Sequence, residues 1–209
     1  MIKLKKVSKK FDDNFVLKDI DLDLYEGNIY GLIGRNGSGK TMLLNTICGF
    51  IKPTYGEVLV DGVNIYENKT FISNARALIE HPKFLGNLTG YQNLELLAGI
   101  NNKIGKNEIE DALKVVDLYS EKDKIYSKYS LGMKQKLGIA QVIMENPKVM
   151  IFDEPFNGLD EKSADKIRKF IKNIKNDKII IIATHIKDDI EMLCDFVYKI
   201  DGGILKNNE

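Results

Sequence analysis

One segment of the chain has the residue types and the spacing of a loop that binds phosphate groups. The sequence GRNGSGKT at residues 34–41 matches the pattern G-x-x-x-x-G-K-[S/T]. Its glycines let backbone N–H groups turn toward an anion, Lys40 offers a cation to the β- and γ-phosphates, and the Thr41 hydroxyl suits Mg²⁺. We therefore predict that ATP is bound by Asn36, Gly37, Ser38, Gly39, Lys40, Thr41 and Met42.

A pair of carboxylates, Asp153 and Glu154, comes directly after the apolar residues 149–152. A buried strand of a parallel sheet delivers its last residues to the carboxyl edge, where ligands of α/β proteins bind. There Asp153 would hold Mg²⁺, and Glu154 would orient or deprotonate the attacking water. By itself such a pair commonly belongs to a solvated turn, but the phosphate-binding loop upstream favours the catalytic interpretation.

A histidine, His185, follows another apolar run at residues 179–183, with only Thr184 between them. A lone histidine is more often structural than functional. At the end of a strand beside the one that carries the acid pair, however, it could donate a hydrogen bond to the γ-phosphate and sense ATP cleavage. We predict this catalytic role and keep the structural role as the alternative.

The hydrophobic pattern predicts the elements that position these side chains. Residues 88–146 show helical periodicity, whereas the chain up to about residue 24 alternates as in an antiparallel sheet. Elsewhere strands are predicted at 29–33, 56–61, 75–79, 149–152 and 179–183, and helices at 41–50 and 161–174. The dipeptide Asp61-Gly62 predicts a hairpin turn after the second of these strands.

These elements predict an α/β fold built on a P-loop ATPase core, in which a mainly parallel sheet is flanked by helices. An N-terminal antiparallel β-subdomain and an inserted all-helical subdomain would complete it. We expect one domain over residues 1–209. Residues 1–86 and 147–209 would form the α/β core with its β-subdomain, and residues 87–146 the helical subdomain that carries residues 129–135.

The composition argues against several other classes of protein. The chain has 209 residues, of which 44% are hydrophobic, enough for a substantial core. Its 31 Lys and Arg against 30 Asp and Glu give a net charge of +1, so no nucleic-acid partner is expected. No apolar run approaches the roughly 20 residues of a membrane helix, and no secretory signal opens the sequence. Cys48 and Cys194 lack metal-site spacing, which favours buried thiols in a reducing compartment.

Along essentially its whole length the sequence resembles the ATPases of ABC transporters. The sequence YSLGMKQ at residues 129–135, just before the acid pair, is similar to the family signature LSGGQ. In the family this segment contacts the γ-phosphate bound to the other subunit, so the resemblance assigns Ser130 and Gly132 to ATP binding. Leu131 and Met133 depart from the family's glycine and glutamine, which predicts an altered affinity of that composite site.

Three further residues take roles only through this resemblance. Asp160, in the sequence NGLD at residues 157–160, resembles the aspartate of the D-loop that links the two nucleotide sites. A simple turn that caps the next helix is the alternative for Asp160. Phe11 resembles the aromatic residue that stacks on adenine, although such a residue is more often part of the core, and Val16 would pack near the base.

Glu80 stands where the family usually has a glutamine that ligands Mg²⁺ and touches the membrane subunit. A carboxylate is also a hard oxygen donor, so the resemblance assigns Glu80 to Mg²⁺, while its charge would weaken ATP binding or alter how coupling depends on pH. An acidic residue of a surface loop is the alternative for Glu80. Residues 78–94 resemble the subgroup that exports lantibiotics and related antimicrobial peptides or confers immunity to them, and this subgroup commonly has Glu here. For the neighbouring His81 we expect only a surface loop.

The resemblance implies an ATP-hydrolysing subunit at the cytoplasmic face of the cell membrane, with ATP and Mg²⁺ as ligands. Two ATPase subunits, identical or related, would close head to tail around ATP and open after hydrolysis. A separate membrane subunit would contact residues 80–94, from Glu80 to Leu94, and translocate the cargo. Export of a peptide antibiotic or drug-like compound is expected.

Three other functions stay open on the sequence alone. A soluble ABC ATPase acting on ribosomes or DNA generally has two cassettes or a long coiled coil, and neither is present here. A P-loop kinase would not need the signature segment or His185. A regulatory subunit with little turnover is compatible with the altered signature and Glu80, and a steady-state ATPase assay separates it from a transport ATPase.

Overall fold

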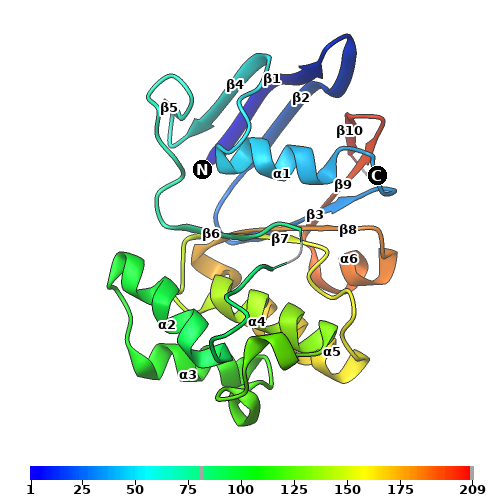
Figure 1. The fold of residues 1–209 in the computed structure, drawn as a ribbon. Coiled ribbons are helices and arrows are strands. Elements are labelled where there is room, and N and C mark those ends of the chain that lie inside the picture. Colours follow the sequence, from blue (N-terminus) through cyan, green and yellow to red (C-terminus); the bar gives the residue numbers. More distant parts are fainter. Residues whose placement is uncertain (81, 208–209) are drawn as a thin grey trace.

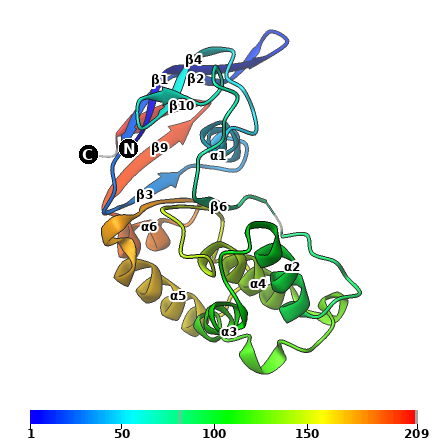
Figure 2. The same ribbon diagram turned by 90° about the vertical axis from the view of Figure 1, so that its left-hand side faces the viewer.

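The computed structural model describes residues 1–80 and 82–207, which form two β-sheets lying one above the other (Figures 1 and 2). One sheet has four strands and the other has six, and helices flank the larger sheet. The α/β fold class predicted from the sequence is therefore confirmed. His81, for which only a surface loop is predicted, lies outside the described residues.

The small sheet is antiparallel, with the strand order β2-β1-β4-β5. Its strands are β1 (Ile2–Phe11), β2 (Asn14–Leu24), β4 (Tyr55–Val60) and β5 (Val63–Asn64). Buried residues alternate with more exposed ones in the second half of β2, because one face of the sheet packs on the core. The turn predicted at Asp61-Gly62 joins β4 to β5.

The large sheet has the strand order β10-β9-β3-β8-β7-β6, and all its neighbouring strands are parallel except β9 and β10. Its strands are β3 (Asn28–Ile33), β6 (Ala75–Leu78), β7 (Val149–Asp153), β8 (Ile179–Thr184), β9 (Phe196–Asp201) and β10 (Ile204–Asn207). Every residue of β7 and β8 is buried, which explains their continuous apolar sequences.

Helices cover both faces of the large sheet. The helix α1 (Lys40–Cys48) lies between the two sheets, and the other helices lie on the opposite face of the large sheet (Figures 1 and 2). These are α2 (Gly90–Asn101), α3 (Lys106–Val115), α4 (Leu131–Ile143), α5 (Glu161–Asn173) and α6 (Lys187–Leu193). Short 3₁₀ turns occupy Tyr119–Glu121, Tyr126–Lys128 and Lys175–Asp177.

Two hydrophobic clusters fill the interior, one on each face of the large sheet. Side chains of β8 alternate between them: Ile179 and Ile181 belong to the cluster around α1, and Ile180 and Ile182 to the cluster around α4 and α5. The second cluster also includes residues of α2 and α3. The segment predicted as a helical subdomain therefore shares its core with the large sheet.

The observed elements differ from the predicted ones mainly near residue 190. The helix α6 and the strands β9 and β10 were not predicted, because α6 has only 7 residues and β9 is mostly exposed or half-buried. The helix α1 ends at Cys48, earlier than predicted, because Gly49 takes a left-handed conformation with φ +87°.

No helix within residues 1–80 and 82–207 combines the length and the apolar character that a membrane crossing requires.

Candidate active site

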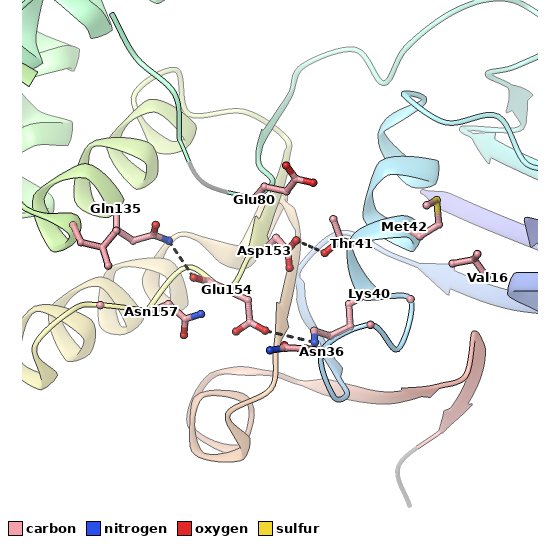
Figure 3. Close-up of a pocket in the computed structure, with 14 residues that line it drawn as sticks. Val16, Asn36, Lys40, Thr41, Met42, Glu80, Gln135, Asp153, Glu154 and Asn157 are labelled. Atoms are coloured by element: carbon pink, nitrogen blue, oxygen red, sulfur yellow. Dashed lines mark hydrogen bonds and ion pairs between the residues drawn. The ribbon is translucent and has the colours of Figure 1, made fainter. Parts of the chain in front are cut away.

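Several of the predicted site residues, among them Lys40, Thr41, Asp153 and Glu154, meet at the carboxyl edge of the large sheet (Figure 3). The strands β3, β8 and β7 are parallel neighbours, so the segments that follow them lie side by side. A cavity of about 630 Å³ opens beside the segments that follow β3 and β7. It is lined by Val16, Asn36, Gly37, Gly39, Lys40, Thr41, Met42, Glu80, Leu131, Gln135, Asp153, Glu154, Asn157 and Gly158.

The loop of residues 34–41 turns sharply from β3 into α1. Gly37 and Gly39 have φ angles of +78° and +112°, which residues with a Cβ rarely adopt. A Cβ on Gly39 would also lie 3.1 Å from the carbonyl oxygen of Val16. The first N–H groups of α1 thus open toward the cavity without a side chain in the way, as anion binding requires.

Lys40 is the buried cation of the site, with 6% of its surface exposed. Its Nζ donates a hydrogen bond to the carbonyl oxygen of Gly34 at 2.7 Å and lies 3.5 Å from Oε1 of Glu154. The ammonium group therefore stands between the phosphate loop and the acid pair.

Asp153 is a buried carboxylate with one oxygen unpaired. Its Oδ2 accepts a hydrogen bond from the Thr41 hydroxyl at 2.6 Å, whereas Oδ1 is buried without a partner among the described residues. Burial raises the pKa of Asp153, and the negative charge of Glu154 adds to this, against the Thr41 hydrogen bond. The unpaired oxygen and the Thr41 hydroxyl are hard donors, so these residues fit Mg²⁺. Glu80, also assigned to the metal, lines the cavity beside them.

Glu154 is held by both strands that end at the site. Its Oε2 accepts a hydrogen bond from the Thr184 hydroxyl at 3.0 Å and lies 3.0 Å from Nδ1 of His185. Its backbone N–H donates to the carbonyl oxygen of Ala183 at 2.7 Å, and its φ is +50°. The acid pair and the histidine, predicted from separate parts of the sequence, are thus in direct contact.

Gln135 also contacts the acid pair, although it was not predicted as a site residue. It lies on α4, is 5% exposed, and its Nε2 donates to the carbonyl oxygens of Glu154 and Pro155 at 3.1 and 3.0 Å. One signal was available in the sequence: position 135 shares a helical face with the apolar residues Ile139 and Val142, so a polar side chain stands there on an apolar face. Asn157, which lines the cavity, had no such signal.

The signature segment and the D-loop contact each other within one subunit. Ser130 caps α4 by accepting a hydrogen bond from the Met133 N–H at 3.2 Å. A Cβ on Gly132 would lie 2.7 Å from the carbonyl oxygen of Gly158, so only glycine fits there without a shift. Leu131, which departs from the family pattern, is 66% exposed and lines the cavity.

Asp160 caps α5, as the alternative interpretation proposed. Its two carboxylate oxygens accept hydrogen bonds from the backbone N–H and the hydroxyl of Ser163, at 2.9 and 2.7 Å. Asp160 is not part of the cavity lining, and neither are Ser38, Ser130, Gly132 and His185. Its D-loop role stays a prediction.

The two residues expected near adenine are placed differently. Val16 lines the cavity, whereas Phe11 lies at the end of β1, is 47% exposed and is not part of the lining. The Lys9 ammonium lies 4.8 Å from the centroid of the Phe11 ring. Stacking of Phe11 on adenine stays a prediction.

Residues 17–157 match the model of the ABC transporter family, and this segment includes the phosphate loop, the signature segment and the acid pair. The chain belongs to the ABC transporter family. A bacitracin transport ATP-binding protein, BcrA of Enterococcus faecalis, is 42% identical over 208 residues, which cover 98% of this chain and 68% of that protein. The uncharacterized ABC transporter ATP-binding protein YybJ of Bacillus subtilis is 37% identical over 210 residues, covering 100% of this chain and 96% of the relative.

Solved structures agree with this assignment. A bacterial ABC transporter cassette solved as a dimer superimposes with a TM-score of 0.89 at 26% identity, covering 100% of this chain and 98% of that one. A post-hydrolysis state of the same cassette, bound to ADP and phosphate, gives a TM-score of 0.88 at 25% identity with the same coverage. This ABC chain is therefore an ATP-binding subunit of a transporter and an ATPase, as the sequence predicted.

Proposed function

We propose that this ABC subunit hydrolyses ATP in the cavity at the carboxyl edge of the large sheet, with Glu154 as the general base. One observation carries the proposal: the Glu154 carboxylate lies between Lys40 Nζ, at 3.5 Å, and His185 Nδ1, at 3.0 Å. A base in this position faces the phosphate-binding loop and has a partner that orients it.

The phosphates of ATP bind at the open N-terminus of α1, where backbone N–H groups and Lys40 meet them. To reach them, the Lys40 ammonium leaves Oε1 of Glu154 and the carbonyl oxygen of Gly34. Oε1 is then free to accept a proton from the attacking water, while Thr184 and His185 hold Oε2. Arrival of the substrate thereby releases the base from its internal ion pair.

Mg²⁺ would be held by Thr41 and Asp153, with Glu80 as a further oxygen donor. When bound, the ion neutralises charge on the β- and γ-phosphates. The buried, unpaired Oδ1 of Asp153 supports this assignment, because a buried carboxylate oxygen without a partner is costly unless a ligand satisfies it.

Two copies of the subunit would face each other head to tail and bind ATP between them. Ser130 and Gly132, which the resemblance assigns to ATP binding, lie outside the cavity lining, and this supports their use at the site of a second copy. A relative with 26% identity was solved as a dimer. Closure would be favoured by contacts to the γ-phosphate and lost after hydrolysis.

A membrane subunit would dock on the helical subdomain, residues 87–146, and on the segment that precedes it. Residues 80–94 include Leu85, which is 54% exposed, and the adjoining helix α2 exposes Leu96 and Ile100 at 55% and 75%. Such an apolar surface suits a protein partner. Docking would place the subunit peripherally at the cytoplasmic face of the membrane.

The cargo we propose is an exported antimicrobial peptide or drug-like compound. This rests on the 42% identical relative, which is named a bacitracin transport ATP-binding protein, and on a 29% identical one, which is named a lantibiotic transport ATP-binding protein of Streptococcus pyogenes.

Steady-state ATPase measurements on Glu154→Gln test the catalytic proposal. We expect kcat to fall by about 10²–10⁴-fold with ATP affinity retained, because the base is lost while the phosphate loop is intact. Size-exclusion chromatography with ATP and Mg²⁺ should then reveal a trapped dimer. Lys40→Ala should instead lose ATP binding. Turnover by Glu154→Gln at the native rate would exclude Glu154 as the base.

Co-purification from solubilised membranes tests the docking proposal. Leu85→Glu should lose a multi-span membrane partner, because it places a charge in the apolar contact, and the soluble subunit should still hydrolyse ATP. Met192→Glu, which alters an equally exposed apolar residue on α6 (56%), should retain the partner. Loss of the partner from both variants, or from neither, would contradict docking at residues 80–94.

A further inference from the structure

A buried arginine on α5, which has no role in the proposed hydrolysis mechanism, contacts two chain segments that lead to the active site. Arg168 is only 9% exposed. Its Nη1 donates to Oε1 of Glu161 at 2.8 Å and to Oδ1 of Asp165 at 2.7 Å, and its Nη2 donates to Oδ1 of Asp189 at 2.5 Å. Two of these acids are on α5, and the third is on α6.

The first segment that Arg168 contacts continues directly from the acid pair. The guanidinium carbon lies 5.0 Å from the centroid of the Phe156 ring, and Phe156 is 6% exposed. Phe156 follows Glu154 by two residues. On the other side of this segment, Gln135 donates hydrogen bonds to the carbonyl oxygens of Glu154 and Pro155. The backbone that carries the base is thus fixed between α4 and α5.

The second segment leads back to the histidine. Asp189 is 2% exposed on α6 and follows His185 by four residues. His185 Nδ1 lies 3.0 Å from Oε2 of Glu154. One guanidinium therefore contacts both chain segments whose side chains meet at the active site.

Among the three ion pairs of Arg168, only the one with Asp189 is buried on both sides. The side chains of Glu161 and Asp165 are 74% and 49% exposed, so solvent screens their attraction to Arg168, whereas that of Asp189 is 3% exposed. The attraction within a buried ion pair offsets the cost of desolvating both charges only when the geometry of the pair is good, so such a pair adds little to stability. The planar fork of arginine supplies donors in several fixed directions at once, which a lysine ammonium does not.

We propose that Arg168, through Asp189, is a positioning residue for ATP hydrolysis. It holds α6 against the segment after the acid pair and so fixes the His185 ring against the Glu154 carboxylate. This inference rests on the proposed roles of Glu154 and His185, and it adds a residue that touches neither ATP nor the reacting atoms.

Kinetics of Arg168→Lys and Asp189→Asn provide the first test. We expect kcat to fall by about 10- to 100-fold, because small misplacements of catalytic groups cost that much. KM for ATP should change less than about twofold, since the phosphate loop keeps its own contacts. Arg76→Lys is the matched control: Arg76, on β6, pairs with Glu145, whose side chain is 4% exposed in the turn after α4. A loss of thermal stability alone, as in that control, would overturn the proposal.

A double-mutant cycle tests the route through the histidine. If Arg168 acts by placing His185, then Arg168→Lys should lower kcat less than about twofold further in a His185→Ala background. Equal effects of Arg168→Lys in both backgrounds would refute this route. Native kcat in His185→Ala alone would instead refute the proposed catalytic role of His185.

Imidazole NMR on the nucleotide-free protein separates positioning from hydrolysis. The chain has 2 histidines, so His185→Ala identifies the ring signals of His185 by their loss. Those signals should shift in Arg168→Lys and Asp189→Asn and stay unchanged in Arg76→Lys. Unshifted His185 signals in both test variants would overturn the positioning role, whatever the ATPase rates are.

Discussion

At the scale of single residues, the candidate active site holds one cation, Lys40, and two carboxylates, Asp153 and Glu154. Lys40 and Asp153 are 6% and 5% exposed, and Glu154 lies next to both in sequence or in space. Burial raises the pKa of Asp153, so the ionised form of this carboxyl opposes folding. On the proposed mechanism, bound Mg²⁺ would relieve this opposition.

The nucleotide-free variant Asp153→Asn should be more thermally stable than the wild type at pH 7. A carboxyl whose pKa is raised by folding contributes stability fully below its unfolded pKa, near 3.8, and loses it as the pH rises through the folded value. At pH 7 the wild type therefore bears the cost of a buried negative charge at residue 153. The uncharged side chain of Asp153→Asn avoids this cost. The gap in Tm between the two proteins should narrow as the pH falls toward 4.

Differential scanning fluorimetry across this pH range measures the effect. Asp13→Asn, at a fully exposed side chain, is the control and should leave Tm nearly unchanged at every pH. ATP with Mg²⁺ should raise the Tm of the wild type far more than that of Asp153→Asn. A lower Tm for nucleotide-free Asp153→Asn at pH 7 would contradict the buried-charge argument.

At the scale of elements, two helices are capped by residues to which the family resemblance assigns roles at the nucleotide sites. Ser130 caps α4, and Asp160 caps α5 through two hydrogen bonds to Ser163. These bonds lower the pKa of Asp160. Each residue therefore has a structural role that a simple loss-of-function variant would confuse with a role at a nucleotide.

Two substitutions at Asp160 separate these roles. Asp160→Ala should lower the urea midpoint, because Ala cannot cap α5, whereas Asp160→Ser should nearly keep it, because serine is a good N-cap residue. If Asp160 also links two nucleotide sites, then Asp160→Ser should lower the ATPase rate at native stability. Native ATPase rates in Asp160→Ser would leave Asp160 as a helix cap only.

The elements that the sequence predicts well are those whose burial is uniform or strictly periodic. The strands β3, β7 and β8 are short apolar runs because both their faces are buried. The phosphate loop follows β3 and the acid pair ends β7, so both motifs could be placed from the sequence. The helix α6 and the strand β9 carry no such pattern, since tertiary contacts define them. For the same reason the hydrogen bonds of Gln135, and the position of Phe11 outside the cavity lining, follow only from the three-dimensional fold.

At the scale of the whole molecule, each hydrophobic cluster contains or contacts one cysteine. Cys48 belongs to the cluster between the sheets, and Cys194 packs against the cluster on the other face. Burial raises the pKa of each thiol to about 12. Since the thiolate is the reactive form, both side chains should be inert in the folded protein.

Thiol labelling should therefore report unfolding on both sides of the large sheet. With an aromatic disulfide reagent at pH 8, Cys48 and Cys194 should react at least tenfold more slowly than in urea-unfolded protein. Cys48→Ser and Cys194→Ser leave one thiol each and resolve the two rates. We expect both rates to rise at the same urea concentration, because the clusters share the strands of one sheet. Immediate labelling of either thiol without urea would contradict its burial.

The position of β3 within the large sheet has a consequence for synthesis on the ribosome. This strand carries the phosphate loop, but its neighbours, β8 and β9, are formed by residues 179–184 and 196–201. Because translation delivers the N-terminal part first, the loop emerges long before the strands that hold it. A nascent chain is therefore expected to complete its nucleotide site only after residue 201 has left the exit tunnel, so cellular ATP should assist the folding of this sheet only from that point on.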